Sequence, residues 1–406
     1  ANTTGDSNVS LGRQSLKSNT TASNNTAIGT FALCANTTGF GTAVGYGAMK
    51  ANTTSAGGTA MGYQALCSNT TGDNNTAFGL ETLSKNTTGT NNTAVGRDAL
   101  EVNTTGENNT AMGFEAGKAN TTGSGNTAVG KDALLTNTTG STNTAVGLCA
   151  LNANTTASDN TAVGRGALIV NTTGQYNTAV GRNALAANNA DNNTAVGLCA
   201  LCANTSGSTN VAVGKLALED NTTGQCNTAV GNDAGAAHTT GTGNTSLGRV
   251  ALKSATTGNG NVAIGFKAGC NITTSTNNLA IGCLAGADAV VNLAQYGNNI
   301  VIGNNEHTNA YIKIDWTVTS DLRDKTNIEN VPHGLDFINQ ITPVKYNFKT
   351  SREDDTPHGR TKYGFKAQEI LALEGENPVI INNDNEDNLK LTGAHLIPVL
   401  VNAIKE

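Results

Sequence analysis

The stretch "NNTAVGRDALEVNTTGENNTAMG" at residues 91–113 contains one pattern twice, because the NTAVG of residues 92–96 returns as the NTAMG of residues 109–113, 17 residues later. The glycine of this pattern recurs along most of the chain, with a spacing of 17 except for two steps of 16. A fixed period of this length is the signature of a repeat architecture. Seventeen units therefore occupy residues 1–286. Their glycines are Gly12, Gly29, Gly45, Gly62, Gly79, Gly96, Gly113, Gly130, Gly147, Gly164, Gly181, Gly197, Gly214, Gly231, Gly248, Gly265 and Gly282.

Each position of the unit keeps one kind of residue, so the repeats form columns. The residue before the glycine is apolar, as in Val95, and the fourth residue before it is usually Asn. The third residue after it is small, and the fourth is usually Leu, with Gly in four units. Asn-Thr-Thr-Gly or a close variant joins one unit to the next.

This composition disfavours helices, because Asn, Thr and Gly have low helix propensity and no apolar i, i+3, i+4 pattern is present. Short apolar runs between turn residues favour β-strands, one set per coil. We therefore predict a mostly β fold, a parallel β-solenoid or β-roll of about seventeen 17-residue coils. Stacked coils place like side chains on each other. We expect an amide ladder from the Asn column and a continuous apolar core from the Val95 and Leu columns. The column after the glycine, which contains Arg97 and Lys131, is expected to face solvent and ligands.

The coils have little to bury. One large apolar residue and one Leu per coil contribute roughly 3–6 kcal/mol, whereas ordering 17 residues costs about 1–2 kcal/mol each. The coils must therefore stack, and we expect them to pack against other chains in a trimeric rod. At about 4.8 Å per coil, seventeen coils span roughly 80 Å.

Composition excludes several function classes. Hydrophobic residues make up 37% of the chain and aromatic residues 4%, which is too lean for a globular core of 406 residues. The net charge of −6 is mild and spread out, so we expect no nucleic-acid partner. No apolar run reaches the length of a membrane span, so we expect no membrane insertion. Cys199 and Cys202 form a CxxC pair without a second pair, and we expect neither a metal nor a cofactor.

A boundary lies near residue 300. All five prolines follow it, and residues 320–406 are richer in charge than the repeats. Residues 287–319 are interpreted as a transition and cap, which includes a predicted strand at 309–321. Residues 320–406 are predicted to form a small α+β domain. Its pattern indicates a short helix before Pro343, then a strand, and a closing helix with one apolar side formed by Leu396, Ile397, Leu400, Val401 and Ile404.

Four blocks of this last domain carry a family resemblance. They are SDLRDKTNI (320–328), GLDFINQITPVKYNFK (334–349), YGFKAQEI (363–370) and HLIPVLVNAIKE (395–406). Together they resemble the peptidase S74 family, the C-terminal intramolecular chaperone domains of phage tail spikes, tail fibres and endosialidases. The repeats separately resemble the head repeats of trimeric autotransporter adhesins. The combination looks like a fibre protein of a tailed phage or a large DNA virus.

The resemblance implies a chaperone that trimerises, aligns three chains and then cuts itself off at Thr319–Ser320. Ser320 Oγ would be the nucleophile and Lys325 its base, with Asp321 and Arg323 in supporting roles. A lysine acts as a base only where burial lowers its pKa. Residues five apart do not share a helix face, so the pair must meet across a turn or between subunits. We expect no enzyme activity beyond this single self-cleavage.

The expected function is that of a structural fibre of a virion, a tail or capsid fibre that projects to the host surface. Its expected partners are two further copies of itself, virion attachment proteins, and a host receptor or glycan. The alternative is a bacterial or cellular trimeric adhesin, or an extracellular filament, located outside the cell or at its surface.

Overall fold

The computed structural model describes residues 2–287, 292–294, 296–304, 306–307, 320–349, 352, 354–383 and 389–406. The chain divides into two compact units, Ala1–Asn304 and Asn305–Glu406. We call the first unit the rod and the second the C-terminal domain, and describe each by itself.

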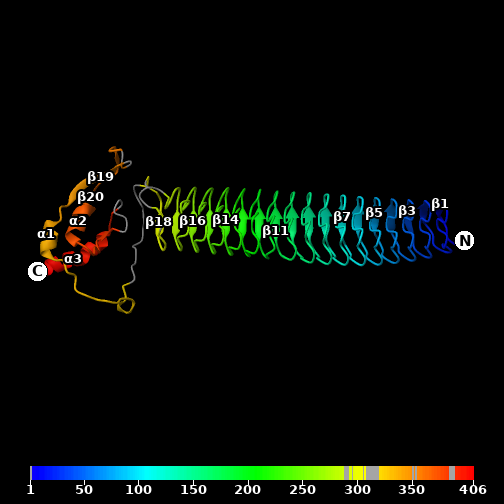
Figure 1. The fold of residues 1–406 in the computed structure, drawn as a ribbon, viewed down its shortest axis with the longest axis horizontal. Helices are drawn as coiled ribbons and strands as arrows, with labels where there is room; N and C mark the ends of the chain where they lie inside the picture. Colours follow the sequence, from blue (N-terminus) through cyan, green and yellow to red (C-terminus); the bar gives the residue numbers. More distant parts are fainter. Residues whose placement is uncertain are drawn as a thin grey trace. The chain divides into compact units, whose positions relative to one another are not determined.

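The rod is a stack of coils that each contribute one short strand to a single parallel sheet (Figure 1). Each strand pairs with the next in the chain at equivalent positions, so that β6 and β7 align Ala94 with Ala111 and Val95 with Met112. The predicted parallel β-solenoid of about 17-residue coils is confirmed. The sheet continues to β18, beyond residue 286. The strands are β1 (Val9–Leu11), β2 (Thr26–Ile28), β3 (Gly41–Val44), β4 (Gly58–Met61), β5 (Thr76–Phe78), β6 (Thr93–Val95), β7 (Thr110–Met112), β8 (Thr127–Val129), β9 (Thr144–Val146), β10 (Thr161–Val163), β11 (Thr178–Val180), β12 (Thr194–Val196), β13 (Val211–Val213), β14 (Thr228–Val230), β15 (Thr245–Leu247), β16 (Val262–Ile264), β17 (Leu279–Ile281) and β18 (Ile300–Ile302).

The rod's core is made of small residues and leucines. Ala94 in the strand and Ala99 after the glycine are fully buried, and Leu100 is 2% exposed. The expectation that the apolar residue before the glycine lies in the core is wrong, because Val95 is 36% exposed. Successive side chains of a strand point to opposite faces. The alanine points inward, where the leucine column leaves room for a small side chain only, and the larger neighbour points outward.

Two asparagine ladders run through the interior. In the first, Asn103 Nδ2 donates to Asn86 Oδ1 of the preceding coil at 2.8 Å and to the Gly106 carbonyl at 3.0 Å. In the second, the Asn109 backbone N–H donates to Asn92 Oδ1 at 2.9 Å. Asparagines at both positions are buried in most of the coils. These side chains supply the partners that buried backbone groups at the turns require.

The glycine of each coil allows the coils to approach closely. Gly96 has a φ of 130°, and a Cβ added there would lie 2.4 Å from the Gly113 carbonyl oxygen. The core leucines carry strain of their own, since Leu100 has a φ of 50°, a region that larger residues seldom adopt. Burial of each leucine offsets this cost.

The pattern changes from the coil of Gly231 onward, where the position of the first ladder holds His238, Ala255 and Ile272 in turn. After Gly231, the leucine is replaced by Gly235 and the ladder asparagine by His238, which is fully buried. His238 Nδ1 lies 2.9 Å from the Gly235 carbonyl oxygen. Within the described residues, His238 Nε2 and Asn221 Oδ1 of the coil before have no hydrogen-bond partner. The first ladder therefore ends at Asn221, and the apolar core divides between Ala234 and Ala251.

The C-terminal domain is a small α+β unit, as predicted. Its core joins residues from all its helices, including Phe337, Ile370 and Val399. The helix before Pro343, the strand after it and the closing helix are confirmed. The predicted apolar side of the closing helix is wrong, because the helix buries Leu396, Val399 and Ala403. Of the other predicted members, Ile397, Leu400, Val401 and Ile404 are all exposed. The elements are η1 (Leu322–Asp324), α1 (Leu335–Gln340), β19 (Val344–Lys349), β20 (Pro357–Gly364), α2 (Ala367–Glu374), β21 (Ile381–Asn382), β22 (Lys390–Leu391), η2 (Gly393–His395) and α3 (Leu396–Lys405).

Two further expectations concern the strand at 309–321 and membrane insertion. The predicted strand at 309–321 lies almost entirely outside the described residues. Among the helices that the structure describes, none has the length and apolar character needed to span a membrane.

Candidate functional site

Ser320 and Lys325 meet across a turn. The single 3₁₀ turn of η1 reverses the chain between them, and Lys325 Nζ donates to Ser320 Oγ at 2.7 Å. Of the two arrangements that the sequence left open, the contact across a turn within one chain is therefore observed. Thr319, the other residue of the expected scissile bond, lies outside the described residues.

Asp321 and Arg323 hold that turn in shape. Asp321 caps η1, because its Oδ1 accepts from the Arg323 backbone N–H at 2.9 Å. The Arg323 guanidinium also donates two hydrogen bonds to the carboxylate, from Nη2 to Oδ2 at 2.6 Å and from Nε to Oδ1 at 3.1 Å. The guanidinium and then the backbone N–H lower the pKa of Asp321, so it stays ionised. Both side chains point at each other rather than at Ser320, which fits supporting roles.

The pair is open to solvent in the single chain. Ser320 and Lys325 are both exposed. A serine hydroxyl needs a base to take its proton, and a lysine serves as that base only when it is withdrawn from water. One chain thus supplies the contact between the two residues but not the burial that the chemistry requires.

The remainder of the domain is organised by carboxylates that sequence patterns did not indicate. Glu374 at the end of α2 accepts from the backbone N–H groups of Val379, Ile380 and Ile381 at 2.7–3.0 Å. Glu406 accepts from the Leu335 N–H at 2.7 Å and so ties the end of α3 to the start of α1. The only sequence signal for either contact would be a carboxylate beside a helix end, which is common among surface residues.

Other polar residues of the domain have structural partners. The His333 ring stacks on Phe337 with centroids 4.2 Å apart, and Lys366 forms an ion pair with Glu369 at 2.5 Å. The Lys366 pair lies at the start of α2 and leaves the packing of Ile370 intact.

Metal-ligating side chains and the CxxC pair of the rod are the remaining candidates for chemistry. No group of three or more metal-ligating side chains gathers in the described part of the chain. In the rod, burial and then the neighbouring Cys199 raise the pKa of Cys202 to about 12. That thiol therefore stays protonated at neutral pH and is a poor nucleophile or ligand.

Comparison with protein families adds one finding. The profile of the Peptidase_S74 family, described as chaperone of endosialidase, matches residues 320–377. The match begins at Ser320, contains Lys325 and extends just beyond α2. Comparisons with curated proteins and with solved structures gave no match.

Proposed function

We propose that this chain is a fibre protein of a virion, a parallel homotrimer whose assembly is directed by a self-cleaving C-terminal domain. The rod and the S74 match together fit a fibre that needs chaperone-assisted folding. The main observation in support of the trimer is a line of apolar side chains on the outer face of the rod's sheet.

That line extends along the rod, with one residue per coil directly before the glycine. Soluble monomers seldom expose contiguous apolar surface on this scale. The line contains no charged residue. Identical chains in parallel and in register would bring like residues together and remove the line from water, so two further copies are the occupants we propose. Its most exposed members are Leu11 (66%), Met61 (44%), Met112 (46%), Leu247 (44%) and Ile302 (65%).

The C-terminal domain has a matching feature. On α3, Ile397 is 60% exposed and Ile404 83% exposed, although the helix already buries its other face. A second apolar face on a short terminal helix is consistent with packing against the same helix of other copies. Rod and C-terminal domain thus each offer a surface for self-association.

In the proposed cleavage, Ser320 Oγ attacks the carbonyl carbon of Thr319 while Lys325 takes the hydroxyl proton. The peptide C–N bond breaks, the freed Ser320 amine takes up a proton, and the resulting ester is hydrolysed by water. Because the pair is exposed in the single chain, a neighbouring chain must cover Lys325 before it can act as a base. Cleavage would therefore follow assembly, and loss of the chaperone would make the assembly irreversible.

The first experiment tests the trimer. Sedimentation should give three times the chain mass for the folded Ser320→Ala variant, which is expected to stay full length. Val95→Asp combined with Met112→Asp should shift the mass toward monomer while the β-sheet circular dichroism stays. Arg97→Ser, in the neighbouring outward column, is the matched control and should leave the trimer intact. A stable monomer or dimer of the Ser320→Ala variant alone would exclude the proposal.

The second experiment tests the cleavage. Wild type should yield a fragment that starts at Ser320, whereas Ser320→Ala and Lys325→Ala should stay full length and remain trimeric. A new N-terminus elsewhere, or efficient cutting by Ser320→Ala, would remove Ser320 from the mechanism.

A third experiment addresses location. The chain should be found in purified virions beside capsid or baseplate proteins. Recovery from a bacterial or cellular surface instead would favour the adhesin or filament.

A further inference from the structure

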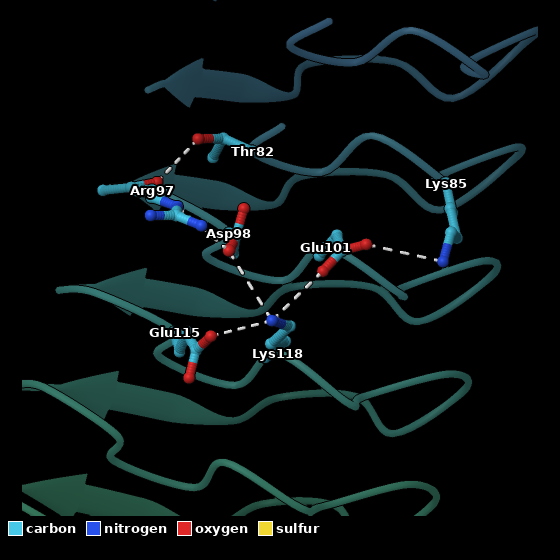
Figure 2. A network of polar contacts seen from close by, with 8 residues as sticks. Thr82, Lys85, Arg97, Asp98, Glu101, Glu115 and Lys118 are labelled. Carbon is cyan, nitrogen blue, oxygen red and sulfur yellow. Dashed lines mark hydrogen bonds and ion pairs between the residues drawn. The ribbon is translucent and has the colours of Figure 1, made fainter. Parts of the chain in front are cut away.

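Three columns of the rod form a continuous strip, in which the first column is mostly exposed and the other two are largely half-buried, with Asp98 only 4% exposed. They contain the residues one, two and five positions after each coil glycine. Arg97 Nε lies 3.3 Å from Asp98 Oδ2, which joins the first two columns. Lys118 Nζ lies 2.8 Å from Glu115 Oε1 and 3.6 Å from Asp98 Oδ2, which joins the second and third columns within a coil and between coils (Figure 2).

In the four coils that follow Gly79, Gly96, Gly113 and Gly130, the cations of the strip are paired within the strip, and we call this part the acidic half. Lys118 contacts three carboxylates, those of Asp98, Glu101 and Glu115, and Figure 2 shows its ammonium between them. Lys131 lies 3.7 Å from Asp132, and its ammonium and the Arg97 guanidinium both lie within 6 Å of the Phe114 ring centre. The cations of this part of the strip are thus already paired, and acidic residues outnumber basic ones. The charged residues are Glu81, Arg97, Asp98, Glu101, Glu115, Lys118, Lys131 and Asp132.

In the seven coils that follow Gly164 through Gly265, the strip has the opposite balance, and we call this part the basic half. Arg165 and Arg182 follow each other in adjacent coils of the first column, and both are exposed. Their neighbours in the second column are Gly166 and Asn183, so no acid faces them there. The ion pairs of the described rod include neither guanidinium, nor Lys215 of the same column. Basic residues outnumber acidic ones in this part of the strip. The charged residues are Arg165, Arg182, Lys215, Glu219, Asp233, Arg249, Lys253 and Lys267.

This basic half is unexpected for a chain with a net charge of −6. It arises because the acidic residues of the strip concentrate in the four coils from Gly79 to Gly130, whereas the other coils of the strip contain mostly basic residues, including Arg13, Lys17 and Lys50. Arg165 and Arg182 repel each other at a coil spacing of about 4.8 Å. Nothing in the core requires either cation, since both side chains point outward. A bound anion would relieve the repulsion.

We propose that the basic half of the strip, with Arg165 and Arg182 at its start, binds a linear acidic polysaccharide through its carboxylate or sulfate groups. The inference rests on the proposed contact with a host surface and names the chemistry of the partner. Guanidinium groups pair well with such anions. Cations in five of the seven coils of this half, set along one line, fit an extended polymer. The exposed Leu198 in the same column offers apolar surface to sugar rings, whereas the Phe266 ring already lies against Arg249 and Lys267. Nucleic acid fits less well, because the net negative charge and the acidic half of the strip would repel its dense phosphates.

The test is the binding of fluorescent polygalacturonate to the full chain at low salt, measured by anisotropy. Arg165→Ser with Arg182→Ser should weaken binding about tenfold or more. Arg97→Ser with Lys131→Ser removes two cations from the same column in the acidic half, and should change binding by less than about twofold. Uncharged dextran should not bind.

Several outcomes would overturn the proposal. They are absence of wild-type binding, equal losses in the two double variants, binding to dextran, or tighter binding of single-stranded DNA than of polygalacturonate. Sedimentation of the same samples separates this result from the fibre proposal. A trimer that does not bind the polymer refutes polysaccharide binding by the strip and leaves the fibre proposal standing.

Discussion

The rod and the C-terminal domain obtain order in opposite ways. In the rod, a residue contacts copies of itself one coil away, as Asn103 contacts Asn86 and Asn120. In the C-terminal domain, unlike residues far apart in sequence meet once, as Glu406 meets Leu335. The rod's stability is therefore close to a sum over similar neighbours, whereas the domain depends on single contacts without a substitute. The contrast implies that equivalent substitutions should differ in cost between the two parts.

The largest difference should come from alanine at a glycine. Gly96→Ala adds a Cβ against the Gly113 carbonyl at a φ of 130°, so the coils must separate. We expect a loss above about 4 kcal/mol in urea unfolding. Gly375→Ala in the C-terminal domain has a φ of 77° but open space around the added Cβ. Only backbone strain of about 1–3 kcal/mol is then expected. Equal losses would refute the close-stacking account of the rod.

The next test removes one ladder residue. Asn103→Ala takes the partner from Asn86 Oδ1 and from the Gly106 carbonyl in the core. We expect a loss of about 2–5 kcal/mol, since each unsatisfied buried group costs about 1–3 kcal/mol. Asn91→Gly, at an exposed position where other coils already have glycine, should change stability by less than about 0.5 kcal/mol. Hydrogen exchange should show the loss in the coils beside Asn103 first.

The C-terminal domain has its own single anchor. Glu374→Ala leaves three backbone N–H groups without their carboxylate, for an expected loss of about 2–3 kcal/mol. Glu374→Gln keeps one acceptor oxygen and should lose less. Hydrogen exchange should show faster exchange of the Ile380 and Ile381 amides, while the protection of the rod's amides stays the same. Loss of protection in the rod would contradict the separation into two units.

The smallest effect concerns pH and the coil that contains His238. Burial lowers the pKa of His238, opposed by the Gly235 carbonyl. The unfolded chain then binds a proton more readily, so stability should fall as the pH drops below 6.5 and level off below the folded pKa. The charged residues of this and the adjoining coils include Glu219, Asp220, Asp233 and Lys253, and Asp233 pairs with Lys253 at 3.7 Å. None of them is among the causes of the shift.

The matched variant restores the common pattern in this coil. Gly235→Leu with His238→Asn should remove the decrease of the melting temperature between pH 7.5 and pH 5.5 that we attribute to His238. A decrease of the same size in both proteins would mean that other groups cause it.

The sequence predicted the rod well because its period is uniform. The Leu column, the Asn ladder and the outward column of Arg97 follow from position in the repeat. Which strand residue points inward could not be predicted from the repeat. In Thr-Ala-Val either the alanine or its two neighbours can face the core, and burial of the larger residue is the usual arrangement. Here the interior is too narrow, and Val95 is left for contacts outside the coil. The predicted ladder is that of the column four residues before the glycine, where Asn109 contacts Asn92. The ladder of Asn86 and Asn103 was not predicted, because its asparagines belong to the Asn-Thr-Thr-Gly segments that were interpreted as joins between units.

The candidate site was only partly predictable. The motif gave Ser320 and Lys325 and left two geometries open, and the structure shows the contact within one chain. The contacts of Glu374 and Glu406 depend on distant segments without periodic signal, so no local pattern could predict them. The roles of Ser320, Asp321, Arg323 and Lys325 in cleavage stay predictions.

Two coils contain 16 residues instead of 17, and the sheet passes through both without a shift. Thr26 pairs with Thr42 and Thr178 with Thr194, so each missing residue comes out of a turn. The coil is therefore an exchangeable module. Gain or loss of one module by unequal recombination would lengthen or shorten the rod by about 4.8 Å and leave every other contact as it was. The length of the rod can thus evolve through the number of coils alone.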